Sequence, residues 1–257
     1  METEKIVVTK VAKKKLIPVF DLFENSWKMY RDNFKSLISI SLYSLFGLIA
    51  IIIGVALVSG LVVFLSMRGQ GSIVGTILIV ALIALLALAA LAAAIWYSTR
   101  SKIGTYLLIK NNFSSVKDSW NESKEIFWPF FWLSLLSAVL VILWAILLII
   151  PGIIFAIFYS FAILLFIFEG QKGMTAIKAS KDLVKGYWWA IFGRFIFVGF
   201  ALYLLSLLLG LPVNATEGNQ LLSGVFSIFN SVVMFVVSPF LYVYSVLLFK
   251  NLKEVKK

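Results

Sequence analysis

The sequence contains no cysteine and no histidine. Without cysteine, the chain can form neither a disulfide nor a thiolate metal site, and it offers no thiol for a lipid anchor. Without histidine, it lacks the side chain that most often serves as a general base or a zinc ligand. No carboxylate pair falls within an apolar run, and no Walker loop, Rossmann glycine pattern or HExxH string is present. We therefore expect no enzymatic activity, no cofactor and no metal site.

Charged residues are also scarce, at 14% of the chain, whereas 61% of the residues are hydrophobic. Soluble domains carry about a quarter charged residues. A helix needs about 20 apolar residues to cross the hydrocarbon, and the apolar runs here are continuous rather than alternating as in barrel strands. The sequence therefore predicts an all-α integral membrane protein. Six transmembrane helices are expected, at about 36–66, 72–98, 128–149, 153–168, 189–211 and 220–248.

Basic residues are unevenly distributed along the chain. Nearly all of the 23 Lys and Arg precede the first predicted helix, follow the sixth, or fall between the second and third or the fourth and fifth. Only Arg68 falls in a connection on the opposite side. Because basic residues are retained on the cytoplasmic side, we expect a cell-membrane protein with both termini in the cytoplasm. The outer connections are then at about 67–71, 150–152 and 212–219.

The N-terminal segment is polar and lacks the apolar run of a signal peptide. The sequence thus predicts a basic tail over 1–15, a single membrane domain over 16–249 and a second basic tail over 250–257. The net charge of +11 comes mainly from basic residues in these tails and in the predicted cytoplasmic connections. We expect these cations to meet anionic lipid headgroups, at about 1 kcal/mol for each well-placed cation, rather than nucleic acid.

Each predicted cytoplasmic segment carries an amphipathic stretch just before a membrane helix. In the first stretch, aromatic residues recur at steps of three and four, which places them on one face of a helix. The pattern returns 93 residues later and, more weakly, after a further 61, where Lys181 replaces the central tryptophan. We interpret the chain as three copies of an interfacial helix followed by a membrane hairpin, the alternative being that such stretches arise independently. The aromatic positions of the first copy are Phe20, Phe23, Trp27, Tyr30 and Phe34, and the recurring serine and base are Ser26 and Arg31, Ser119 and Lys124, and Ser180 and Lys185.

The stretch 149–195 carries a more specific pattern. It consists of a Pro-Gly turn (Pro151, Gly152), an apolar helix ending in Glu169, an Ala-x-x-x-Ser segment (Ala176, Ser180) and a Lys-Gly-aromatic entry to the next helix (Lys185, Gly186, Tyr187). In this pattern the chain resembles the membrane domain found on some glycerophosphodiester phosphodiesterases and related stand-alone six-helix membrane proteins of unknown function. The resemblance covers the C-terminal half well and the remainder through overall layout. Because the soluble phosphodiesterase barrel is missing, the resemblance implies a membrane module and not the enzymatic activity.

Ionisable groups inside a membrane are the first places to look for function. Arg194 lies about two turns beyond Tyr187, where a snorkelling side chain reaches the cytoplasmic headgroups. The alternative is an ion pair with Glu169 at the cytoplasmic end of the fourth predicted helix. Such a pair would clamp two helices or bind a headgroup phosphate through the guanidinium.

Other polar or helix-breaking residues within the apolar runs are few. Asn230 and Ser231 are expected to hydrogen-bond to a neighbouring helix, with a binding role as the alternative. Pro239 is expected to kink the last helix. Pro151-Gly152 is interpreted as the outer turn of a tight hairpin, with a gating role as the alternative.

The alanine-rich string 87–94 contains small residues four positions apart, including Ala90 and Ala94. Such pairs allow close backbone approach to another helix, either inside the bundle or at a subunit contact. A homo-oligomer and a membrane partner protein therefore both stay open.

Two functions from different classes fit these features. The first is a non-enzymatic membrane protein that contacts lipids or partner proteins through its cytoplasmic face, with Arg31, Lys124 and Lys185 as candidate lipid contacts. The second is a transporter or channel subunit for a hydrophobic or lipid-like substrate, which internal repeats favour. A polar cavity reaching the middle of the membrane near Asn230 would favour the second.

Overall fold

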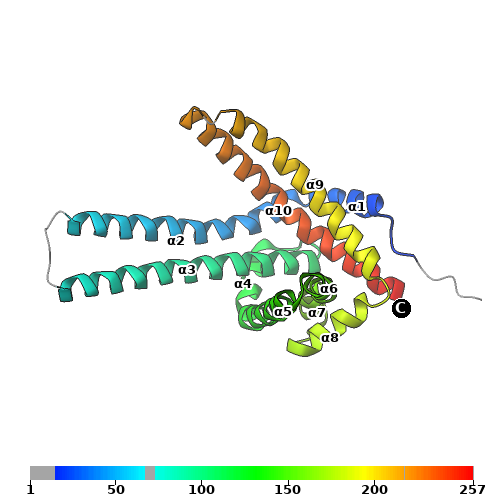
Figure 1. Ribbon diagram of the computed structural model, residues 1–257. Coiled ribbons are helices and arrows are strands. Elements are labelled where there is room, and N and C mark those ends of the chain that lie inside the picture. Colours follow the sequence, from blue (N-terminus) through cyan, green and yellow to red (C-terminus); the bar gives the residue numbers. More distant parts are fainter. Residues whose placement is uncertain (1–14, 67–72, 217, 257) are drawn as a thin grey trace, which may run out of the picture.

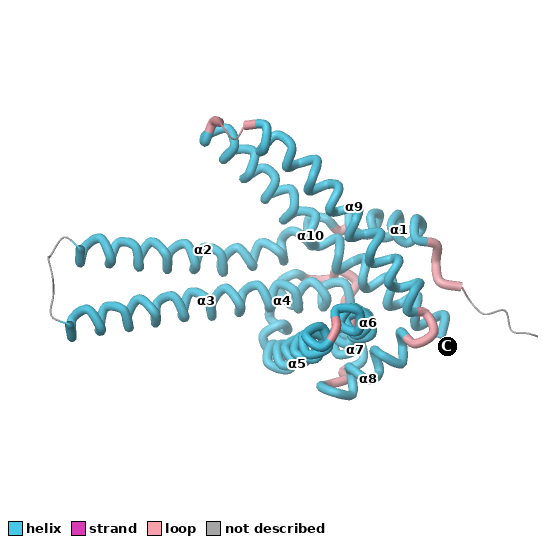
Figure 2. The backbone as a smooth tube through the Cα atoms, in the orientation of Figure 1, coloured by secondary structure: helices cyan, strands magenta, loops and turns pink. Residues whose placement is uncertain are grey.

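The computed structural model describes residues 15–66, 73–216 and 218–256, which form ten α-helices and no strand (Figure 1; Figure 2). The helices are α1 (Val19–Asp32), α2 (Phe34–Ser66), α3 (Ile73–Lys110), α4 (Val116–Glu125), α5 (Phe127–Leu147), α6 (Ile149–Tyr159), α7 (Ala162–Glu169), α8 (Gly173–Val184), α9 (Trp188–Ala215) and α10 (Gln220–Lys256). Six segments among the described residues are long and apolar enough to cross a membrane. The protein is an all-α multi-pass membrane protein, as the sequence predicts.

The six apolar segments pair as three hairpins: α2 with α3, α5 with α6 and α7, and α9 with α10. In Figure 1, α2–α3 and α9–α10 leave a common region in different directions, and α5 is seen nearly end-on. The common region contains α1, α4 and α8 together with the C-terminal ends of α3 and α10, and we call it the base. The hairpins therefore meet at the base and separate beyond it.

Buried apolar side chains gather at the base. Leu37, Leu108 and Phe161 are fully buried there and belong to the cores that join the hairpins. Toward the far ends of the hairpins, by contrast, Ile146 and Leu221 are 77% and 83% exposed. Apolar side chains are stable at such positions when lipid takes the place of water. The base is thus held by protein packing, and the outer parts of the hairpins present surface that suits a bilayer.

Two helices extend beyond their predicted ends. The helix predicted to end near 98 continues as α3 to Lys110, because Ile103 and Leu107 recur at helical spacing and are buried. The helix predicted to end near 248 continues as α10 to Lys256, so most of the predicted basic tail is helical. Residues 1–14 of the predicted N-terminal tail, and the predicted connection 67–71 with Arg68, lie outside the described residues.

The predicted fourth helix differs from the structure in two details. The backbone turns at Leu148, which is extended at φ −158° and ψ 135°, so Pro151 and Gly152 are not the turn. They lie in the first turn of α6, where a missing N–H costs nothing because the first four N–H groups of a helix have no partner in any case. The segment is also divided, since α6 ends at Tyr159 and α7 begins at Ala162.

Small residues set the spacing within two hairpins. A Cβ atom added at Gly152 would lie 2.7 Å from Cα of Ala145, so only glycine allows α6 this close to α5. In the first hairpin, a Cβ on Gly54 would lie 2.8 Å from Cβ of Ala90. The close approach expected of the alanine-rich string is therefore made to α2 of the same hairpin.

Candidate functional site

The base is built around three short helices, α1, α4 and α8, each of which directly precedes a hairpin. Each of them has buried residues along one side, including Leu22 in α1, Ser123 in α4 and Ile177 in α8. Their recurring serines, Ser26, Ser119 and Ser180, are each fully buried at 0% exposure. The shared serine of the sequence pattern therefore lies at the packed face of each short helix. We call α1, α4 and α8 the base helices.

The serines have different partners. Ser26 donates to the carbonyl oxygen of Leu22 in its own helix at 2.6 Å, and the hydroxyl of Ser119 has no hydrogen-bond partner among the described residues. Ser180 donates to the carbonyl oxygen of Phe158 at 2.7 Å and accepts from the N–H of Phe161 at 3.2 Å. These two groups border the break between α6 and α7. The hydroxyl of Ser180 thus satisfies backbone groups that an unbroken helix would pair internally.

The position that the sequence pattern predicts to be central in each copy is occupied by an aromatic or cationic side chain. Trp27 packs on Phe240 of α10, with ring centroids 6.0 Å apart. Trp120 stacks on Tyr43 of α2 at 4.2 Å with planes 13° apart. In the third copy, the ammonium of Lys181 lies 5.6 Å from the ring centroid of Phe155. Lysine can take the place of tryptophan here because an ammonium group placed over an aromatic ring is attracted by the ring, so it also packs on aromatic neighbours.

Arg100 of α3, which sequence reasoning missed, fastens α4 to the first hairpin. Its guanidinium lies 4.0 Å from the ring centroid of Trp120, on which Tyr43 also stacks. The guanidinium donates to the carbonyl oxygen of Trp120 at 2.6 Å and to the hydroxyl of Ser123 at 3.1 Å. Arg100 is 9% exposed, and these partners carry no negative charge. The only sequence signal was its place at the end of the charge-free run 69–99.

Arg194 also hydrogen-bonds to backbone carbonyl oxygens, and it does not pair with Glu169. It is 8% exposed, and its guanidinium donates to the carbonyl oxygen of Ala190 at 2.8 Å and to that of Ile17. Its Nε has no partner among the described residues, while its own carbonyl oxygen accepts from the hydroxyl of Tyr244 at 3.0 Å. The ion pair with Glu169 raised as an alternative is therefore wrong. Arg194 instead joins the segment before α1 to α9.

Glu169 pairs with Lys253 of α10. One turn to either side, Lys250 lies 5.6 Å from the ring centroid of Phe168, and Lys256 donates to the carbonyl oxygen of Asp182. The basic end of α10 therefore packs against α7 and α8. These cations contact protein, whereas the sequence alone suggested headgroups for the tail as a whole.

Arg31, Lys124 and Lys185 lie at the ends of the base helices and are all exposed. Arg31 is 4.0 Å from the carboxylate of Asp32, an exposed pair of little energetic weight. It also lines a depression of about 660 Å³ at the turn into α2, together with Lys35. The side chains of Lys124 and Lys185 make no hydrogen bond or ion pair with another described residue. These three cations are thus available to an anionic partner.

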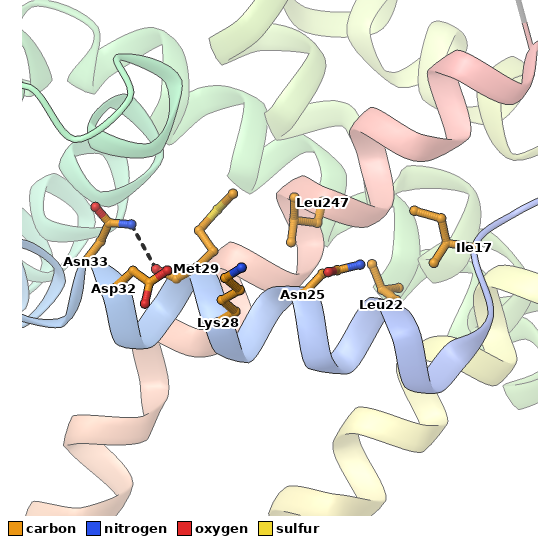
Figure 3. Close-up of a pocket in the computed structure, with 8 residues that line it drawn as sticks. All are labelled: Ile17, Leu22, Asn25, Lys28, Met29, Asp32, Asn33 and Leu247. Atoms are coloured by element: carbon orange, nitrogen blue, oxygen red, sulfur yellow. Dashed lines mark hydrogen bonds between the residues drawn. The ribbon is translucent and has the colours of Figure 1, made fainter.

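A second groove, of about 440 Å³, runs along α1 (Figure 3). Asn25, Lys28 and Asp32 line it from α1, and Leu247 lines it from α10. At one end, the side-chain amide of Asn33 donates to the carbonyl oxygen of Met29 at 2.9 Å. Because Lys28 and Asp32 carry opposite charges, this groove selects for neither sign of ligand.

Tyr30 joins α1 to the middle of α10. Its hydroxyl donates to the carbonyl oxygen of Val236 at 2.6 Å, and burial raises the pKa of Tyr30 above its usual value near 10. Pro239 is three residues further along α10 and lacks the N–H that would reach Phe235. Ser238 instead donates its hydroxyl to the carbonyl oxygen of Phe235 at 2.8 Å. The backbone near Pro239 is therefore satisfied by side chains.

Among the described residues, Asn230 and Ser231 of α10 make no hydrogen bond to another helix. Ser231 donates to the carbonyl oxygen of Ser227 at 2.9 Å within α10. The side-chain oxygen of Asn230 is buried and has no hydrogen-bond partner among the described residues, so the bond expected for it is not found there. Asn230 also lines none of the grooves described above.

Comparison of the chain with protein-family models, with curated proteins and with solved structures finds no match in any of the three. The resemblance to the phosphodiesterase-associated membrane domain therefore stays a prediction. What the molecule does must be argued from its own geometry.

Proposed function

We propose that the protein is a non-enzymatic protein of the cell membrane that binds anionic lipid headgroups through the base. The base helices would lie in the headgroup layer on the cytoplasmic side, with both termini in the cytoplasm. The observation that carries the proposal is the exposure of Arg31, Lys124 and Lys185 at the same position of three similar helices. Cations beside amphipathic helices are typical of proteins that contact an anionic membrane surface.

The three copies also correspond in their helix boundaries. Adding 93 to the last residue of α1 and the first of α2 gives the last residue of α4 and the first of α5, and adding a further 61 to the latter gives the first residue of α9. The same offsets relate buried residues, each below 10% exposure: Tyr30, Ser123 and Val184; Leu37, Phe130 and Ile191; Ile40, Leu133 and Arg194. Equal burial at equal offsets supports three copies of one structural unit.

Aromatic side chains extend the surface that would meet the headgroups. Trp128 and Trp189 follow the base helices α4 and α8 and are 59% and 77% exposed. Trp27 and Phe20 of α1 are also exposed. Tryptophan is enriched where a membrane meets water, because its ring is apolar and its N–H is polar. An exposed tryptophan beside an exposed cation thus fits the headgroup boundary.

A transport function would require a path through the membrane. Asn230, the polar residue that would have marked such a path, lies among the side chains of α9 and α10 and not in a described cavity. We therefore place the lipid-contact function first. The same geometry gives no reason to propose nucleic acid as a partner, because the exposed cations alternate with apolar aromatic surface.

The test is a measurement of lipid preference in reconstituted vesicles. Energy transfer from tryptophan to dansyl-labelled lipid reports whether phosphatidylglycerol or phosphatidylcholine is enriched around the protein. The wild type is expected to prefer phosphatidylglycerol, and the triple variant Arg31→Gln, Lys124→Gln, Lys185→Gln to lose most of that preference. Each cation contributes about 1 kcal/mol at low salt.

A matched control keeps the charge: Arg31→Lys, Lys124→Arg, Lys185→Arg should retain the wild-type preference. A neutral triple variant that prefers phosphatidylglycerol as strongly as the wild type would contradict the proposal. Orientation is tested separately, with Lys117→Cys or Lys178→Cys as the only thiol in a cysteine-free chain. Labelling of either residue from outside the cell would overturn the cytoplasmic placement of the base.

A further inference from the structure

A groove of about 480 Å³ lies between α3, α5, α7 and α10. It is separate from the surface cations Arg31, Lys124 and Lys185, and it lies on the side of α5 that faces α3. Sites for small ligands have about 300–1,000 Å³, so the groove is large enough to hold part of a lipid. Its lining combines a lysine with a mostly apolar surface, and this combination indicates which ligand it would take.

Part of the lining is polar and basic. Lys102 and Thr99 contribute to it from α3. Lys102 is exposed and makes no ion pair or hydrogen bond with another described residue. An unpaired ammonium where α3 leaves its charge-free run is placed for the phosphate of a lipid headgroup.

The remainder of the groove is mostly apolar. Phe130, Phe131, Leu135 and Ala138 line it from α5. From Phe130 to Ala138 the groove follows about 12 Å of helix, at 1.5 Å per residue. An apolar lining of this length can hold part of an acyl chain.

Ser134 is a polar residue within this apolar stretch. Its hydroxyl is buried and has no hydrogen-bond partner among the described residues. A helical serine ordinarily donates to a carbonyl three or four residues earlier, as Ser41 and Ser231 do here. The unpartnered hydroxyl leaves one donor for an oxygen of a bound molecule, such as the ester of a lipid.

The geometry points to a binding site for one anionic phospholipid, with its phosphate at Lys102 and one acyl chain along α5 past Ser134 to Ala138. The ligand is an amphiphile because the cation and the apolar residues line one groove. It is anionic because nothing in the lining carries a negative charge. Bound there, the lipid would join the second hairpin to α3 and α10.

Native mass spectrometry of the detergent-solubilised protein tests the site. Titration with phosphatidylglycerol is expected to show one tightly bound lipid. Phosphatidylcholine with the same acyl chains is expected to bind at least about tenfold more weakly. Ala138→Trp fills the groove and should abolish this binding, whereas Val139→Trp, on the exposed side of the same turn of α5, should leave it unchanged. Lys102→Gln should weaken binding about fivefold.

Several results would overturn the inference: equal binding of the two lipids, wild-type binding by Ala138→Trp, or displacement of the lipid by inorganic phosphate alone. Phosphatidylglycerol with a photoreactive acyl chain gives a second measurement on the unaltered protein. Cross-links are expected on α5 between Phe130 and Ala138, and cross-links confined to other helices would contradict the site. The neutral triple variant at Arg31, Lys124 and Lys185 should keep the bound lipid, which separates this inference from the proposed function.

Discussion

The hydroxyl of Tyr30 donates a 2.6 Å hydrogen bond to the carbonyl oxygen of Val236, 206 residues away in sequence. The bond ties the first base helix to the last hairpin, close to the point where Pro239 interrupts the backbone bonding of α10. The carbonyl oxygen of Val236, next to the Phe235 carbonyl that Pro239 leaves without its helical N–H donor, thus accepts from a side chain in a distant part of the chain. This relationship between α1 and α10 gives the first of five predictions.

Tyr30→Phe removes the donor and keeps the ring. The carbonyl oxygen of Val236 loses this partner, which is expected to lower the free energy of unfolding by about 0.5–1.5 kcal/mol, the net contribution of one hydrogen bond. Thermal unfolding in detergent, followed by circular dichroism, measures the loss. Tyr203→Phe, an exposed tyrosine on α9, is the matched control and should unfold like the wild type.

Titration of Tyr30 is expected to lower the stability of the protein at alkaline pH. Burial raises the pKa of Tyr30 in the folded protein, so its contribution to stability is complete below the unfolded pKa near 10. That contribution is lost as the pH rises through the raised pKa, because the charged phenolate is disfavoured in the buried site. Melting temperatures between pH 8 and 11, at about unit steps, should converge for wild type and Tyr30→Phe. A constant difference across this range would show that Tyr30 does not titrate in this way.

Ser180→Ala should destabilise the break between α6 and α7. The N–H of Phe161 and the carbonyl oxygen of Phe158 would both lose the hydroxyl that serves them, at an expected cost of about 1–3 kcal/mol for each buried group left unpaired. Ser26→Ala is the matched control, because its hydroxyl bonds only within α1. Hydrogen exchange at Phe161 should rise in Ser180→Ala alone, and equal exchange in both variants would contradict the assignment.

Gly152→Ala should separate α6 from α5. The added methyl would meet Cα of Ala145 at 2.7 Å, a contact that only movement of the backbone can relieve. Overpacking of this kind typically costs about 1–3 kcal/mol. Gly199→Ala is the control, since a Cβ there meets nothing within 4 Å, and it should be neutral or slightly stabilising. Comparable melting temperatures for the two variants would show that the α5–α6 spacing is not set by Gly152.

Arg100 and Trp120 should be coupled energetically. Arg100→Gln and Trp120→Leu each break the stack that holds α4 against α2 and α3, so the double variant should lose less stability than the two single losses added together. A coupling of about 0.5–2 kcal/mol is expected for a partly desolvated cation over tryptophan. Arg31→Gln is the control for loss of a cation without a stack. If the two single losses of stability add up to that of the double variant, Arg100 acts through its hydrogen bonds alone and not through the stack.

The sequence by itself determined the membrane class and the number of crossings. Charge-free runs longer than about 20 residues leave no alternative to buried or lipid-covered helices, because an apolar helix must be removed from water over its whole surface. The position of the base helices also followed from local pattern, since residues three and four apart share a helix face. The boundaries at Phe34 and Phe127 fell within two residues of those predicted for the corresponding membrane helices.

Tertiary structure decided the partners of the polar groups. Arg194 bonds to Ile17 and Glu169 pairs with Lys253, whereas the sequence predicted a snorkelling Arg194 or, as the alternative, an ion pair between Arg194 and Glu169. The partners of a side chain depend on which helices the fold brings together. A hydrophobic pattern predicts that a helix face is buried, but not which residues pack against it. The sequence did not predict the break between α6 and α7, which Ser180 stabilises, or the role of Arg100, for the same reason. A hydrogen bond over a few ångströms depends on the arrangement of separate helices in space, which the spacing of residues along one chain does not encode.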